Sequence, residues 1–535
     1  MGVYIFMSIL PDKIGKEEWE KVYEESLELI NAYPFMDSTI DQESYDILWK
    51  YVHRATEKNI RISHNEHSIG WHVFGDYETL LGAESVSLLK DIEYYREWKD
   101  KNESCDDILT MKINERLFYW EEELKLPVTS TTIFDGKTQG FPHHIPLLAI
   151  ACLIESRFPK YAIVWGDITI GQMKKAIDWA NSILTHPIQL TERANNKILL
   201  ERIRSIVQDD RTALKAFMAL TMHNKDFRLG DFIKEHFDRS TLTAYYTAHF
   251  SQYNIETFGF HDALRNFFDL GFSIDQACDI CVLDPNGCRY DAEIFAEAVL
   301  SMLWPIDKKD LNQRLSESDE AENETPDTVY SQFGRTFLKM AGVQEGVKTN
   351  FTSHDVTAIL QSKLGHVVNI PSLLKNKKEK EAQDGIDDKD VADFYEQLKV
   401  NLDKTDAELK AYTISDLDDL ILWKKGDSLH PNIEKAIKRI KDFVDEGKNR
   451  RQSSYDEFHS YENNKKIKWL IHLNDYFYIR KETWDYYIAN IHQSDVIDSL
   501  FGLLIIKTDE LNTNKLCKAI VNNVDLFKAY MVGSD

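Results

Sequence analysis

The pattern of apolar and polar residues changes at about residue 190. Before it, apolar runs and amphipathic stretches alternate: residues 2–10 predict a strand, residues 16–33 a helix, and residues 135–190 a strand–helix–strand unit. After it, apolar residues recur at helical spacing, and short connections predict antiparallel helix pairs. The pattern therefore indicates an α+β chain that is predominantly α-helical, with a small mixed α/β N-terminal domain followed by a large helical body.

The unit at residues 135–190 is the most complete one in the pattern. The apolar run Tyr161–Trp165 predicts a buried strand, and a capping-box spacing that starts at Thr169 predicts a helix after it. Residues 187–190 predict a second strand. Because ligands bind beyond the carboxyl ends of strands in β-α-β units, Asp167 and Thr169 are expected at a binding site.

Changes in composition predict the domain boundaries. Hydrophilic stretches at residues 316–327, 375–390 and 447–466 are predicted to be loops or linkers. The tract 469–487 combines aromatic and basic residues, as single-strand-binding surfaces do, but nearby acidic residues favour core packing instead. We expect five segments: an α/β domain at 1–190, a helical domain at 191–305, an acidic linker at 306–330, a helical segment with a charged loop at 331–446, and an aromatic-rich helical C-terminal region at 447–535.

The charge of the chain restricts its partners. The 535 residues carry a formal net charge of −25, and 43% of them are hydrophobic, which predicts a folded protein. The negative charge disfavours a general nucleic-acid interface and an anionic membrane surface, because phosphate repels it. It favours a basic protein partner, which the electric field of the protein would attract. A homo-oligomer is also left open.

The sequence predicts a cytoplasmic protein. Six cysteines in 535 residues do not indicate a disulfide scaffold. The apolar N-terminal stretch lacks the basic region and the cleavage site of a signal peptide. No run approaches the roughly 18 apolar residues that a membrane-spanning helix needs. We therefore expect no membrane association.

Candidate catalytic residues lie close to the predicted unit. The candidates for acid–base catalysis are His143, His144 and Asp167. A histidine exchanges protons near pH 7, and an aspartate can assist it. They would form an acid–base site if the fold brings them together. The groups suited to an anionic substrate are Lys137, Thr138 and Thr169.

Known nucleotide and hydrolase motifs are absent. Gly136-Lys137-Thr138 is similar to the end of a phosphate-binding loop, but Thr131 stands where that motif needs a glycine. No strand is predicted before it, so a turn from Asp135 to Gly140 is favoured. The G-x-S-x-G and G-x-G-x-x-G patterns are also missing. No motif identifies a family, and no cofactor is predicted.

Two clusters contain residue types that bind metals. The first is His64, His67 and His72, and the second is Cys278, Cys281 and Cys288. Neither has the spacing of an established zinc motif, and two of the cysteines lie on an apolar helical stripe. We predict exposed or hydrogen-bonded histidines and core cysteines, with no metal, although the sequence leaves metal binding open.

Charge, helical layout and the missing catalytic motifs favour an interaction protein. The Lys-, Asn- and Ile-rich usage is typical of an AT-rich bacterial genome. A toxin-neutralising immunity protein or a phage-defence component, binding a protein partner through an acidic surface, is therefore predicted. The alternatives are a scaffold and an enzyme, either a hydrolase or a transferase, with its site at the strand ends of the N-terminal domain. The sequence does not decide whether the protein is an enzyme.

Overall fold

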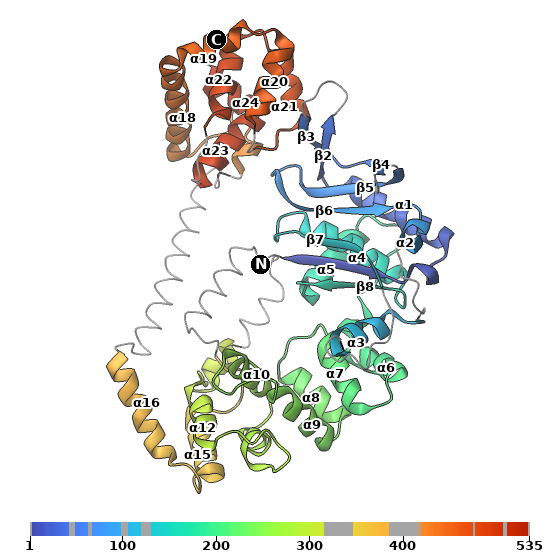
Figure 1. Cartoon of the computed structure of the whole chain (residues 1–535), viewed down its shortest axis with the longest axis vertical. Coiled ribbons are helices and arrows are strands. Elements are labelled where there is room, and N and C mark those ends of the chain that lie inside the picture. Colours follow the sequence, from blue (N-terminus) through green and yellow to red (C-terminus); the bar gives the residue numbers. More distant parts are fainter. Residues whose placement is uncertain are drawn as a thin grey trace. The chain divides into compact units, whose positions relative to one another are not determined.

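Helices dominate the structure, a computed structural model (Figure 1). It describes residues 3–41, 49–61, 67–97, 105–118, 130–314, 346–384, 417, 419–474, 477–506 and 511–532. The two sheets lie in the N-terminal part of the chain, which confirms the predicted α+β, predominantly helical fold. The chain forms two compact units, namely residues 1–29, 88–140 and 144–387, and residues 30–87, 141–143 and 388–535. The five segments expected from composition stay predictions.

The first unit contains a three-stranded sheet. Its central strand β1 (Tyr4–Ile9) pairs antiparallel with β7 (Thr131–Lys137) on one side and with β8 (Ala162–Gly166) on the other. The outer strands β7 and β8 are therefore parallel to each other, and α4 (His144–Arg157) lies between them in the chain, as in a split β-α-β motif. Every second β1 side chain from Ile5 to Ile9 is fully buried, because one face of the strand lies on a core.

The strand and helix predicted around Thr169 are confirmed. After β8, α5 (Ile170–Asn181) starts with the predicted capping box, in which the Thr169 hydroxyl accepts from Gln172 N at 3.2 Å. The strand predicted at residues 187–190 is wrong. The backbone N–H of Ile188 donates to the Asn181 side chain at 2.7 Å, and its carbonyl accepts from the same amide at 3.1 Å. These backbone groups are thus satisfied without a neighbouring strand.

The segment before Gly136 is a strand, contrary to the sequence prediction. Lys137 pairs with Tyr4, so β7 continues to that residue. The turn expected from Asp135 starts only after the strand, where Gln139 and Gly140 have φ angles of 58° and 71°. Few apolar residues mark β7, and its pairing with β1 comes from more than a hundred residues away, which explains the error.

Helices form the rest of the first unit. An apolar core runs through those from residue 108 to residue 373, and its fully buried rings include Phe217, Phe250, Phe267 and Phe268. The helices predicted between residues 191 and 303 are present. The helices besides α4 and α5 are η1 (Pro11–Lys13), α1 (Lys16–Ala32, whose last turn belongs to the second unit), α2 (Glu93–Glu97), α3 (Ile108–Phe118), η3 (Glu192–Ala194), α6 (Asn196–Ile206), α7 (Asp210–Leu220), α8 (Phe227–His236), α9 (Arg239–Phe250), α10 (Phe258–Asp269), α11 (Ile274–Cys278), η4 (Asp279–Leu283), α12 (Ala292–Ser301), α15 (Ser353–Leu364) and α16 (Ile370–Asp384).

The second unit combines a five-stranded sheet with C-terminal helices around one core. The sheet has the order β3-β2-β5-β4, with β6 paired to β5, and its strands are β2 (Phe35–Asp41), β3 (Trp49–Arg54), β4 (Glu57–Arg61), β5 (His67–Asp76) and β6 (Leu81–Leu89). The helices are η5 (Asp419–Leu422), α18 (Pro431–Arg450), α19 (Gln452–Ser460), α20 (Asn463–Leu473), α21 (Lys481–Ala489), α22 (Ser494–Leu504), α23 (Leu511–Asn522), α24 (Val524–Phe527) and η6 (Lys528–Val532).

Two of the predicted hydrophilic loops are corrected by the structure. Residues 447–466 are helical, because Tyr455 and Phe458 anchor the otherwise polar α19 in the core of the second unit. The charged stretch that begins at residue 375 belongs to α16 as far as Asp384. The rest of that stretch and the acidic residues 316–327 lie outside the described residues. In the aromatic tract, Trp484 and Tyr487 are buried, as core packing predicts.

Candidate functional site

The structure brings Lys137 and Asp167 to one end of the three-stranded sheet. Because β7 and β8 are parallel, their carboxyl ends lie on either side of Tyr4 in β1. The Asp167 carboxylate accepts from Tyr4 N at 3.1 Å, and Asp167 N donates to Tyr4 O at 3.0 Å. The Lys137 ammonium lies 5.2 Å from the centre of the Tyr4 ring. Both side chains therefore interact with β1 itself.

Thr138 and His144 are joined at the same end of the sheet. Thr138 Oγ1 donates to Val3 O at 3.2 Å and lies 2.6 Å from His144 Nδ1. Both residues are buried. Thr169 uses its hydroxyl to cap α5. The hydroxyls predicted to bind a substrate thus serve local structure, and their catalytic or binding roles stay predictions.

His143 belongs to the second unit and differs from its neighbour His144. Its side chain is 1% exposed, and neither ring nitrogen has a hydrogen-bond partner among the described residues. Burial lowers the pKa of His143 to about 4, so the ring is neutral near pH 7. No hydrogen bond links it to the other two predicted acid–base residues within the part of the chain that is described.

The candidate metal clusters hold other interactions. Cys278 and Cys281 are fully buried in the core of the first unit, as predicted for packing residues, and Cys288 donates to Thr247 O at 3.5 Å. His72 Nδ1 lies 2.6 Å from the buried carboxylate of Asp37. His64 lies outside the described residues. Across the described ranges, no three His, Cys, Asp or Glu side chains are arranged to hold a metal ion.

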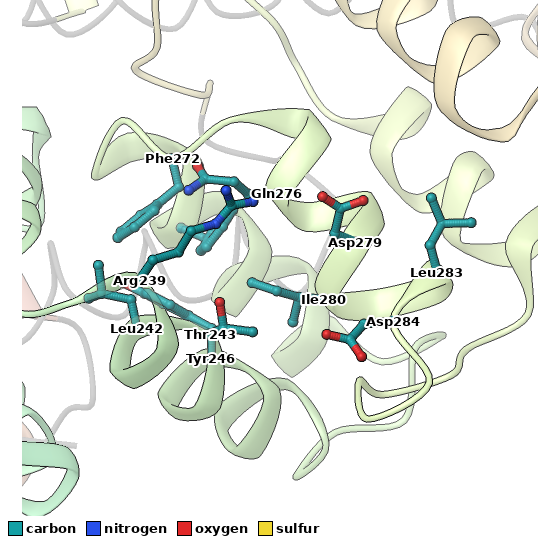
Figure 2. Close-up of a pocket in the computed structure, with 11 residues that line it drawn as sticks. Arg239, Leu242, Thr243, Tyr246, Phe272, Gln276, Asp279, Ile280, Leu283 and Asp284 are labelled. Atoms are coloured by element: carbon teal, nitrogen blue, oxygen red, sulfur yellow. The ribbon is translucent and has the colours of Figure 1, made fainter.

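A pocket of about 350 Å³ lies among the helices of the first unit (Figure 2). One wall is a face of α9, where Arg239, Leu242, Thr243 and Tyr246 recur at the i, i+3, i+4, i+7 spacing of neighbours on a helix. The remaining lining residues come from α10 to Asp284, and they are Phe267, Phe272, Gln276, Asp279, Ile280, Leu283 and Asp284.

The hydroxyl of Tyr246 is an unpaired polar group in this pocket. The Tyr246 side chain is 3% exposed, and its oxygen has no hydrogen-bond partner among the described residues. Its ring makes edge-to-face contacts with Phe267 at 4.7 Å and Phe272 at 4.9 Å between ring centres, which hold it in place. Burial raises the pKa of Tyr246 well above its usual value, so the group stays a neutral donor. An unpaired buried hydroxyl costs about 1–3 kcal/mol, which a ligand that accepts its hydrogen bond would offset.

Positive charge and amide donors lie at one end of the pocket. Arg239 makes no ion pair within the described residues, and Figure 2 shows its side chain beside Gln276. The Gln276 amide oxygen accepts from Ser273 N at 2.9 Å in a capping box, which fixes the side chain. A second hollow of about 670 Å³ shares Arg239, Thr243 and Asp284 with the pocket and is also lined by Arg211. Arg211 likewise has no ion pair in the described part of the chain.

Two carboxylates line the other end of the pocket, as Figure 2 shows for Asp279 and Asp284. Lys363 Nζ donates to Asp279 at 3.0 Å and also lies 3.8 Å from Asp275. One carboxylate oxygen of Asp284 accepts from Asn286 N at 2.8 Å in a turn, and its other oxygen accepts no hydrogen bond from the described residues. The pocket therefore combines a guanidinium group, a buried hydroxyl donor and carboxylate acceptors.

A π-helical turn shapes the wall that carries the carboxylates. The element η4 (Asp279–Leu283) continues α11 with the wider π geometry and places Asp279, Ile280 and Leu283 on the pocket. Such turns occur frequently at functional sites in proteins. No sequence motif marks this pocket. The only local signal is the mixed face of α9, in which Arg239 and Thr243 interrupt an otherwise apolar stripe.

Comparisons with known proteins do not place the chain in a family. No protein-family model, no curated protein and no solved structure matches it. No helix in the described ranges is both long enough and apolar enough to cross a membrane.

Proposed function

We propose that this chain is a ligand-binding protein, and that the pocket between α9 and η4 takes a small anionic molecule. The observation that carries the proposal is the Tyr246 hydroxyl, which is buried in the pocket without a partner and lies on the same helix face as the unpaired Arg239. The volume of about 350 Å³ is within the range of small-molecule sites.

A phosphate-bearing ligand matches the arrangement of charges best. Arginine binds phosphate through two parallel N–H groups, and Arg239 and Arg211 line the hollow that adjoins the pocket. The carboxylates of Asp209 and Asp238 cap α7 and α9 at this end, so the guanidinium groups, rather than the helix termini, supply the attraction. Asp284 lines both the pocket and this hollow, and a ligand hydroxyl or amine would donate to it.

The proposal is tested by titrating the full chain with nucleoside monophosphates, sugar phosphates and their dephosphorylated counterparts in a calorimeter. We expect saturable binding of at least one phosphate ester. The Arg239→Ala variant should weaken it by about a hundredfold, the loss expected for a charged hydrogen bond. Lys174→Ala, which removes an exposed positive charge from α5, is the matched control and should leave the affinity unchanged. Equal binding of the phosphate esters and their dephosphorylated forms would contradict the proposal.

We also propose, from the sequence, that the protein is cytoplasmic, bacterial and bound to a protein partner. The net charge of −25 supports a basic partner, as in immunity or phage defence. Affinity purification from the host at low and physiological salt tests this, and a stoichiometric basic protein released by salt is the expected result. The enzyme alternative is supported by Lys137, Thr138, His144 and Asp167 lying at one end of the three-stranded sheet.

A further inference from the structure

A groove of about 610 Å³ lies along α18 in the second unit. Its apolar side chains on this helix are Ile440, Phe443 and Val444, and Gly447 continues the same stripe. Residues at i, i+3, i+4 and i+7 share one face of a helix, so the stripe is about 11 Å long. Gly502, Ile505 and Ile506, in and after α22, line the groove as well.

The groove exposes apolar surface that the described residues leave uncovered. Phe443 is 59% exposed, although large aromatic side chains are usually buried. A Cβ atom built on Gly447 would meet no other atom within 4 Å, so the space beside this glycine is open. In contrast, a Cβ on Gly502 would come within 2.5 Å of Val444, which shows that α18 and α22 pack closely beneath the groove.

Arginines surround this apolar surface in a chain that is strongly acidic overall. Arg439, Arg450 and Arg451 line the groove, together with Glu446, the single acidic residue among its described lining residues. Arg450 is paired with Glu446, whereas Arg439 and Arg451 make no ion pair within the described residues. Aromatic and arginine side chains are the types enriched at the energetic centres of protein interfaces.

We propose that this groove binds an acidic amphipathic helix of another protein. The apolar stripe has the spacing that a second helix matches with its own residues at i, i+3, i+4 and i+7, as in helix-in-groove recognition. Carboxylates on the flanks of that helix would pair with Arg439 and Arg451. Gly447 lets the partner helix approach α18 closely. This site is separate from the small-molecule pocket and does not depend on it.

The test uses two fluorescent helical peptides with the same leucine face, one with glutamates on its flanks and one with lysines at those positions. Their binding to the full chain is followed by anisotropy. We expect the acidic peptide to bind saturably and at least about tenfold more tightly than the basic one, with an affinity that falls as salt rises. Gly447→Leu fills the groove and should weaken the acidic peptide by about tenfold or more. Gly447→Ala leaves the groove open and is the matched control.

The proposal is overturned if the basic peptide binds as tightly as the acidic one. It is also overturned if neither peptide binds saturably up to about 1 mM, or if Gly447→Leu and Gly447→Ala bind alike. Weaker binding by Gly447→Leu has two explanations, a filled groove or a partly unfolded protein. Unfolding would show as a lower thermal midpoint of the leucine variant than of Gly447→Ala. Arg439→Glu then decides between the two explanations, since it leaves the apolar surface intact and should still weaken the acidic peptide.

Discussion

The strand ends of the three-stranded sheet and the pocket beside α9 differ in how their polar groups are used. At the strand ends, the Asp167 carboxylate binds Tyr4 N, Thr138 binds Val3 O and contacts His144, and Thr169 caps a helix. In the pocket, Tyr246 and Arg239 hold no partner among the described residues.

This difference shows that residue type alone does not identify a ligand site. Histidine, aspartate and lysine are chemically versatile and are therefore predicted as site residues, yet at the strand ends they contact the fold itself. A tyrosine with an unpaired hydroxyl has no such signal, since nothing in the sequence shows where its hydrogen bond goes. Hydrogen-bonding capacity that the fold leaves unused is therefore the better guide.

Among the predicted acid–base residues, His143 is the one whose ring nitrogens have no partner among the described residues. Its substitution is expected to have the largest effect on stability. Burial lowers its pKa from 6.5 to about 4, so the folded state disfavours the protonated form. This contribution is fully present above pH 6.5 and is lost as the pH falls toward 4, by about 3 kcal/mol in total. Urea denaturation of the parent and of His143→Leu across this range should show a pH dependence that is weaker in the variant. Parallel stability curves would contradict the assignment.

Removing a hydroxyl that is in use should destabilise the protein. Thr138→Val preserves shape but deletes the bonds to Val3 O and His144, so we expect a loss of about 1–3 kcal/mol in the free energy of unfolding. Thr185→Val, at an exposed position after α5, should change it by less than about 0.5 kcal/mol. Ligand binding in the pocket should be unaffected by both variants. A weakened ligand in Thr138→Val would show that the two regions are coupled.

Removing an unused hydroxyl should have the opposite effect on stability. Tyr246→Phe deletes a buried donor without a partner, so we expect the protein to gain about 1 kcal/mol while losing about tenfold in ligand affinity. The contrasting variant is Tyr290→Phe, whose hydroxyl bonds Phe250 O at 2.6 Å and which should lose stability. Thermal and urea unfolding measure both variants. If Tyr246→Phe were less stable than Tyr290→Phe, the result would show that the Tyr246 hydroxyl has a hydrogen-bond partner.

The smallest effect is expected at Asp167. Asp167→Asn keeps an oxygen that accepts from Tyr4 N, so its stability should change by less than about 0.5 kcal/mol. If the chain is an enzyme at the strand ends, activity would be lost in this variant although the thermal midpoint is unchanged. Retained activity would exclude Asp167 as an acid–base group.

Local interactions explain what could be predicted from the sequence. The capping box at Thr169 involves residues three apart, so its pattern was readable, and the strand before it was marked by a continuous apolar run. Residues 187–190 resembled a strand equally well, but the side chain of Asn181 occupied the backbone groups of Ile188. Residues 447–466 are polar enough to predict a loop, because only two buried aromatic side chains anchor α19.

The pocket could not be predicted because four separate elements, α9, α10, α11 and η4, form it. The sequence of each wall predicts only a common element. α9 has the pattern of an amphipathic helix, and the residues from Asp279 have the pattern of the last turn of an α-helix. The π-helical turn has no recognisable sequence pattern, and the unpaired state of Tyr246 depends on which side chains meet in the folded core.

The discontinuity of the second unit has a consequence for protein synthesis. Its N-terminal segment, residues 30–87, shares a core with helices that begin only at Asp419, and Val52 N donates to Ile479 O at 3.2 Å. A ribosome adding roughly 5–20 residues per second needs roughly 15–70 s to cross the intervening stretch. During that time, the apolar side chains of Met36 and Phe74 lack the C-terminal residues that they pack against in the folded protein. The nascent chain should therefore depend on chaperones, and truncation before residue 419 should yield aggregates.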